Sequence, residues 1–120
     1  TGKVGLYRKS DVLYNPDFTQ PAAMTRWTPI TANYSAQDGD KLLVKTVSSG
    51  VTIMLPSVPT IGDEIRIVDA SINFGTNNCI LSRNGNKIEG VADDFVLDID
   101  RSDVALVYID STTGWRVIND

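Results

Sequence analysis

The feature that most constrains the fold is a run of short alternating segments in the middle of the chain. Within Glu64–Val68 polar and apolar side chains alternate, so that Ile65 and Ile67 share one face. A period of two residues indicates a strand with one buried face. A polar, Gly-containing loop follows at Asn73–Asn78, and a second strand is predicted at Cys79–Arg83. The centre of the chain is therefore expected to form β-structure.

The same pattern recurs from residue 40 to the C-terminus. Asn84–Gly85 predicts a hairpin with a type I′ turn, which needs positive φ at both central residues. About eight short strands separated by turn residues favour an all-β fold, a small antiparallel β-sandwich or barrel. The predicted strands are Lys41–Val47, Val51–Leu55, Glu64–Val68, Cys79–Arg83, Lys87–Glu89, Phe95–Ile99, Val104–Ile109 and Trp115–Ile118. Val104–Ile109 is nearly all apolar and is predicted to be the most buried of them.

The segment Thr1–Asn33 differs from the rest and is interpreted as an extended arm, with the β-sandwich domain at 34–120. Three prolines in the arm disfavour a long helix or a central strand. Its aromatic side chains either pack on the core of the same chain or lie on neighbouring subunits, because aromatics stabilise cores and interfaces alike. The candidate interface residues are Tyr7, Tyr14, Phe18 and Trp27.

Composition excludes several classes of function. A net charge of −4 argues against nucleic acid as a partner, and no apolar run is long enough for a membrane helix. The chain has no histidine, which removes the usual general base and the commonest metal ligand. We therefore expect a protein that is not an enzyme and has no cofactor and no metal.

Two arrangements of carboxylates are candidate sites. The acidic run between Asp93 and Asp103 is interpreted as solvated surface, with a calcium site as the alternative. Glycoside hydrolysis needs two carboxylates at a fixed separation, for which the candidate pairs are Glu64 with Glu89 and Asp63 with Asp69. These residues are expected in strands or turns, where surface charge is ordinary. Cys79, in an apolar strand, is predicted to be a small buried hydrophobe and not a nucleophile.

An ordered set of motifs resembles a β-rich module of tailed-bacteriophage virion proteins, especially tail fibres and other surface appendages. The motifs are Tyr34–Asp40, Val51–Pro56, Ile61–Ile65, Asp69, Asn77–Asn78, Asn84–Gly90 and Leu106–Val117, with its Gly-Trp-Arg-Val ending. The resemblance does not extend to Thr1–Asn33. It implies a non-enzymatic structural module, commonly trimeric, on the exterior of a phage particle and made in the host cytoplasm.

The function expected from this resemblance is assembly on the particle surface. The first placement is a trimeric capsid decoration (cement) protein, whose partners are further copies of itself and the major capsid protein. The alternative is a tail fibre, spike or neck appendage. A third interpretation is a carbohydrate-binding module, if Trp115 and Tyr108 are exposed and stack on sugars. Core packing of these two aromatics is the competing interpretation.

Overall fold

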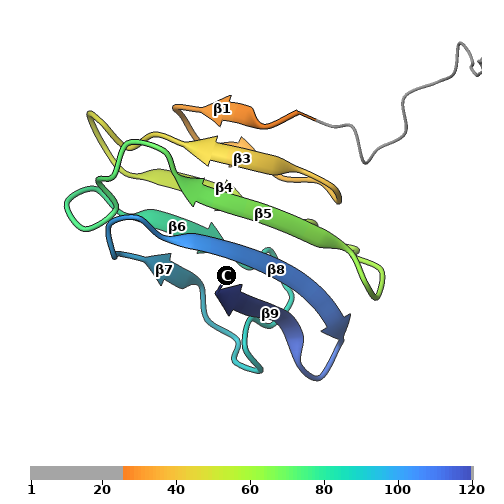
Figure 1. Ribbon diagram of the computed structural model, residues 1–120. Helices are drawn as coiled ribbons and strands as arrows, with labels where there is room; N and C mark the ends of the chain where they lie inside the picture. Colours follow the sequence, from red (N-terminus) through yellow and green to blue (C-terminus); the bar gives the residue numbers. More distant parts are fainter. Residues whose placement is uncertain (1–25, 120) are drawn as a thin grey trace, which may run out of the picture.

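The computed structural model describes residues 26–119, which form nine strands and no helix (Figure 1). The strands are β1 (Thr28–Ile30), β2 (Tyr34–Ser35), β3 (Lys41–Val44), β4 (Val51–Met54), β5 (Glu64–Asp69), β6 (Cys79–Ser82), β7 (Phe95–Leu97), β8 (Asp103–Asp110) and β9 (Gly114–Asn119).

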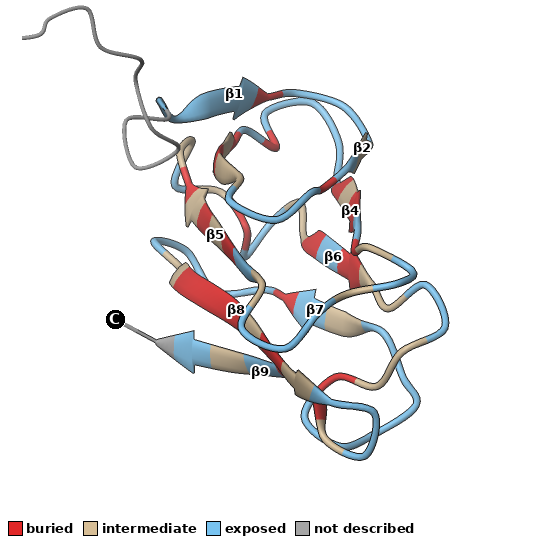
Figure 2. Cartoon of the chain, turned by 90° about the vertical axis from the view of Figure 1, so that its right-hand side faces the viewer, coloured by how far each residue is buried: buried red, intermediate tan, exposed pale blue. Residues whose placement is uncertain are grey.

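The strands form two mixed sheets in a sandwich-like, all-β arrangement. One sheet has the order β1-β3-β5-β8-β9 and the other the order β2-β4-β6-β7. Figure 2 shows β5 and β8 on one side of the molecule and β4, β6 and β7 on the other. The core lies between the two layers, since each strand places alternate side chains inward.

The prediction of an antiparallel sandwich is wrong for four of the seven strand pairings, which are parallel. From β1 to β6 the chain alternates between the two sheets, so each turn of this coil lays a strand beside the strand of the previous turn. Successive turns run in the same direction, and neighbouring strands are therefore parallel. Antiparallel pairing begins only where β7, β8 and β9 close the coil.

Strand positions from residue 41 onward agree with the predicted series, with small shifts at the ends. The exception is Lys87–Glu89, which contributes isolated bridges from Ile88 to Val91 and to Trp115. The strands β1 and β2 were not predicted. Pro29 lies in β1, at the edge of the five-stranded sheet, where a missing N–H leaves no gap in a ladder.

The Asn84–Gly85 turn has the predicted backbone, with φ of 49° and 91°. The predicted hairpin is nevertheless wrong, because β6 pairs with β7 and not with the residues directly after the turn. The Asn84 side chain instead donates a hydrogen bond to the carbonyl of Leu55, 2.9 Å away. The turn thus attaches the chain to the loop after β4.

The predicted arm is only partly within the described residues. Residues 1–25 lie outside them, so the proposed division at residue 34 stays a prediction. Thr28–Ile30, inside the predicted arm, pairs with β3, and Ile30 is buried. The last part of that segment therefore belongs to the sheet.

The core is apolar and continuous between the sheets. Leu106 at the centre of β8 and Trp115 in β9 are fully buried, and much of β8 is coloured as buried in Figure 2. The rings of Tyr108 and Trp115 meet edge to face, with centroids 5.4 Å apart. Val104–Ile109 was predicted to be the most buried strand, and β8 does contribute more buried residues than any other described strand, although Val107 and Ile109 on its outward face are only partly covered.

A buried carboxylate organises one end of the sandwich. Asp69, the last residue of β5, is 3% exposed. Its carboxylate accepts backbone N–H bonds from Asn73, Phe74 and Arg101, at 2.9, 3.0 and 3.0 Å. One side chain thereby fixes both the loop after β5 and the turn before β8.

Candidate functional site

Three of the four predicted interface residues, Tyr7, Tyr14 and Phe18, lie outside the described residues. The fourth, Trp27, is 37% exposed just before β1. The Lys41 ammonium lies 5.5 Å from the centroid of its ring, a cation–π contact with the same domain. The interface role of these four residues stays a prediction.

Asp63 and Asp69 do not form a catalytic pair. Asp63 directly precedes β5 and Asp69 is its last residue, so they are six residues apart along an extended strand, which corresponds to roughly 20 Å. Glycosidase carboxylates are about 5 to 9.5 Å apart. The two side chains cap turns instead: Asp63 accepts the N–H of Thr60, and Asp69 accepts the backbone bonds described above.

Glu64 and Glu89 likewise serve separate local contacts. Glu64 begins β5 and lies 3.9 Å from Arg66 on the outer face of the five-stranded sheet. The Glu89 carboxylate accepts the backbone N–H of Val117 and lies 3.1 Å from the Nε of Arg116. Each carboxylate therefore supports strand geometry at its own position.

The acidic run between Asp93 and Asp103 is divided among turns. Asp94 accepts the N–H of Arg83, and Asp100 accepts the N–H of Gly75, at 2.9 and 2.8 Å. Within residues 26–119 no three acidic or cysteine side chains converge in a way that could hold a metal ion. The calcium alternative therefore gains no support from the described geometry.

Trp115 and Tyr108 are buried, at 0% and 9% exposure. The interpretation of these two rings as an exposed platform for sugars is wrong, because neither has a face open to solvent. Their role is core packing, as the competing interpretation held. The Trp115 Nε1 atom has no hydrogen-bond partner among the described residues.

Cys79 is fully buried in β6, in agreement with its interpretation as a small hydrophobe. Burial, assisted by the negative charge of Asp69, raises the pKa of its thiol to about 12. Because the thiolate is the nucleophile, this environment suppresses reactivity.

We expect Cys79 to react with a thiol reagent at pH 8 about a thousandfold more slowly in the native protein than in urea, because a pKa near 12 leaves little thiolate. The measurement is the rate at which an aromatic disulfide reagent releases its coloured thiolate. Ser49→Cys, in an exposed turn, serves as a control in a Cys79→Ser background and should react rapidly without urea. Native Cys79 reacting within tenfold of the unfolded rate would show that β6 opens readily.

The outer face of the four-stranded sheet is uncharged. Its exposed apolar side chains are Met54, Ile80 and Val96, and Ile80 stands directly opposite Val96 on the neighbouring strand. Its remaining side chains, such as Thr52 and Ser82, are small and neutral. Hereafter this surface is called the uncharged face.

The opposite side of the molecule has a different character. On the outer face of the five-stranded sheet, apolar side chains are interspersed with charged ones from four of its strands. The charged side chains include Lys41, Arg66, Asp103 and Arg116. Arg66 lies 3.9 Å from carboxylate oxygens of both Glu64 and Asp103. Charged groups favour solvent, so the uncharged face is the better candidate for contact with a partner.

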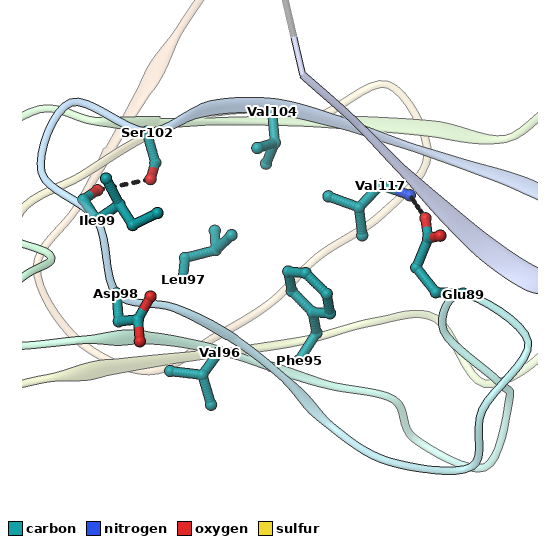
Figure 3. A pocket seen from close by; sticks show the side chains of 9 residues that line it. All are labelled: Glu89, Phe95, Val96, Leu97, Asp98, Ile99, Ser102, Val104 and Val117. Atoms are coloured by element: carbon teal, nitrogen blue, oxygen red, sulfur yellow. Dashed lines mark hydrogen bonds between the residues drawn. The ribbon is translucent and has the colours of Figure 1, made fainter.

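A groove of about 390 Å³ lies where the two sheets separate, between β7 and the strands β8 and β9 (Figure 3). The side chains of Phe95, Leu97, Val104 and Val117 point toward one another across it. Val96 points away, toward the uncharged face. The groove therefore opens along β7, an edge strand of its sheet.

Two carboxylates, Glu89 and Asp98, lie on the rim of the groove, and none of its lining residues is basic. The backbone N–H of Val117 and, more weakly, the adjacent Arg116 hold the pKa of Glu89 below its ordinary value, against a partial desolvation that raises it. Glu89 is therefore ionised at neutral pH. The groove combines an apolar interior with a negative rim.

We expect Glu89→Gln to destabilise the protein at pH 7 more than at pH 3.5. A lowered folded-state pKa means that the carboxylate stabilises the fold above about pH 4.5 and loses this effect as pH falls through the folded value. Urea unfolding at the two pH values measures the difference. Glu64→Gln, at an exposed ion pair, is the control and should cost less than about 0.5 kcal/mol at pH 7. An equal loss for Glu89→Gln at both pH values would contradict the assignment.

No protein-family model matches the chain, and no curated protein matches it significantly in sequence. Within the described residues, no helix has the length and apolarity needed to cross a membrane.

Sequence reasoning missed both the uncharged face and the groove. A signal for the face was present, since Thr52, Met54, Ile80 and Val96 alternate with buried residues and none is charged. The groove left no local signal, because its walls come from strands whose pairing is set by distant parts of the chain.

Proposed function

We propose that this chain is a structural protein of a bacteriophage virion, which acts by assembly on the exterior of the particle as a trimeric capsid decoration protein. The uncharged face is the observation that supports assembly best. Its partners would be further copies of the chain and the major capsid protein. The phage assignment rests on the resemblance of residues 34–117 described above.

The uncharged face fits a permanent contact between copies better than a solvated surface. Met54, Ile80 and Val96 are 42%, 36% and 46% exposed on three adjacent strands, where Ile80 stands opposite Val96 and Met54 is diagonal to Ile80. Contiguous apolar surface is costly in water and is typical of protein interfaces.

Placement in a tail fibre, spike or neck appendage is the second candidate. The coil of parallel strands supports it, because β1 and β2 end their sheets with an edge that no described strand covers. Such an edge can receive a further parallel strand from a neighbouring chain. A fibre built by stacking would use this edge, whereas a decoration trimer would use the uncharged face.

The assembly proposal is tested by light scattering at micromolar concentration. The unmodified chain should have the mass of a trimer, and Ile80→Glu should shift it toward the monomer by placing charge in the patch. Ile61→Glu is a matched control, since Ile61 is 73% exposed away from the uncharged face and should leave the trimer intact. A monomeric unmodified chain, or a trimer unaffected by Ile80→Glu, would overturn this proposal.

The placement is tested by binding of the full-length chain to particles of the encoding phage that lack it. A decoration protein should bind heads without tails, whereas an appendage module should require tails or connectors. Electron microscopy of the particle would then locate the bound chain. Binding to neither heads nor tails would contradict a role in the virion.

A further inference from the structure

The groove lies beside a strand edge that is open to pairing. β7 pairs with β6 along one edge, and no described strand pairs with the other. An open edge next to an apolar groove is the arrangement by which folded domains bind an extended segment as an added strand. Main-chain hydrogen bonds then provide affinity, and alternate side chains enter the groove.

The charges around β7 define the segment that fits. The strand reads Phe-Val-Leu and is flanked by Asp94 and Asp98. Asp98 is exposed on the groove rim, and no described residue forms an ion pair with it. A complementary segment therefore needs a short apolar centre with a cation on each side.

The chain itself contains such a segment outside the described residues. Residues 3–8 read Lys-Val-Gly-Leu-Tyr-Arg, in which an apolar centre is flanked by Lys3 and Arg8. In an extended conformation Val4 and Leu6 share one face, as Phe95 and Leu97 do. The only comparable segment nearby, Val-Leu-Tyr at 12–14, is flanked by Asp11 and Asp17 and has the wrong charge.

We propose that residues 3–8 add as a strand to the free edge of β7, with Val4 and Leu6 in the groove and the flanking cations beside the acidic rim. This inference goes beyond the proposed function, because it does not depend on where the protein acts. Tyr7 lies on the other face of the added strand, so it stays available to a partner.

The length of the connecting chain allows this placement within one chain or between two. Residue 26 leads into β1, at the opposite edge of the five-stranded sheet from β9. Four strand spacings separate these edges, roughly 19 Å. The connecting segment 9–25 can extend to roughly 56 Å. Residues 3–8 can therefore occupy the groove of their own chain or that of a second copy.

The test is disulfide trapping in the full-length chain with Cys79→Ser. Leu6→Cys is paired with Ile99→Cys on the groove rim, which is 71% exposed. The matched control pairs Leu6→Cys with Ile61→Cys. Ile61 is 73% exposed in the loop before β5. A second control pairs Leu13→Cys with Ile99→Cys. We expect the first pair to oxidise at least tenfold faster than either control.

Non-reducing electrophoresis distinguishes the two placements, and both support the proposal. A cross-link within one chain keeps the monomer mass, whereas one between chains doubles it. Asp98→Lys should slow the cross-link at least threefold at low salt, because it reverses the charge that faces the cations. Equal rates for the test pair and either control, or a rate unaffected by Asp98→Lys, would overturn the proposal.

Discussion

Replacement of Asp69 with alanine is expected to lower the free energy of unfolding by about 4 kcal/mol. The change leaves the backbone N–H groups of Asn73, Phe74 and Arg101 without their acceptor. A buried, unsatisfied polar group costs about 1 to 3 kcal/mol. The bond from Phe74 is buried and those from Asn73 and Arg101 are partly buried, so water can recover part of the loss at the last two. Guanidinium unfolding followed by tryptophan fluorescence gives the free energy.

The control for this change is Asp63→Ala, which removes a carboxylate from the other end of the same strand. Asp63 is partly exposed and accepts one N–H bond, from Thr60, so we expect a loss of about 1 kcal/mol. Asp69→Asn should lie between the two, because an amide keeps one acceptor oxygen. A loss for Asp69→Ala no larger than that for Asp63→Ala would mean that the loop after β5 is held by other contacts.

Asp69 also shows why the sequence predicted elements better than it predicted their roles. The alternation of Ile65 and Ile67 is local, and it located β5 within one residue of its end. The burial of Asp69 depends on a turn that is distant in the sequence, at Arg101. A carboxylate at the end of a predicted strand reads as surface charge unless that distant contact is known.

The direction of strand pairing was predicted wrongly for a similar reason. Short strands separated by turn residues are compatible with hairpins and with a coil that alternates between two sheets, because both produce the same period of two. The two are distinguished by parallel pairing of strands that are separated in the chain by a strand of the other sheet, as for β3 with β5 and β4 with β6. The strands β1 and β2 are too short to show a period of two in the sequence.

The candidate sites also divide into those predictable from local sequence and those that depend on distant contacts. The burial of Cys79 followed from its own strand, whereas the burial of Trp115 follows from Ile88 and Tyr108, which lie beside it in the fold. The groove requires β7 and β9 to end different sheets at the same side of the core. Such surfaces follow from topology, and the antiparallel topology predicted from the sequence is wrong for four of the seven strand pairings.

Gly114→Ala is expected to cost about 2 to 5 kcal/mol, and the reason lies in the contact between β9 and the bridge at Ile88. Gly114 has φ of 74°, and a Cβ atom there would overlap the backbone carbonyl of Lys87. The carbonyl oxygen of Lys87 also accepts the N–H of Trp115, at 2.9 Å, so the backbone cannot withdraw without losing this bond. Left-handed strain of about 1 to 2 kcal/mol adds to an overpacking cost of about 1 to 3 kcal/mol.

Gly90→Ala separates these two contributions. Gly90 has φ of 77°, almost the same as Gly114, but no atom lies within 4 Å of the position that its Cβ would take. Its substitution should therefore cost only the backbone strain, about 1 to 2 kcal/mol. Urea unfolding of both variants gives the difference, which we expect to equal the overpacking cost alone, about 1 to 3 kcal/mol. If the two losses were equal, the backbone around Lys87 would have to yield without cost, and the close approach of this segment to β9 could not be what requires glycine at position 114.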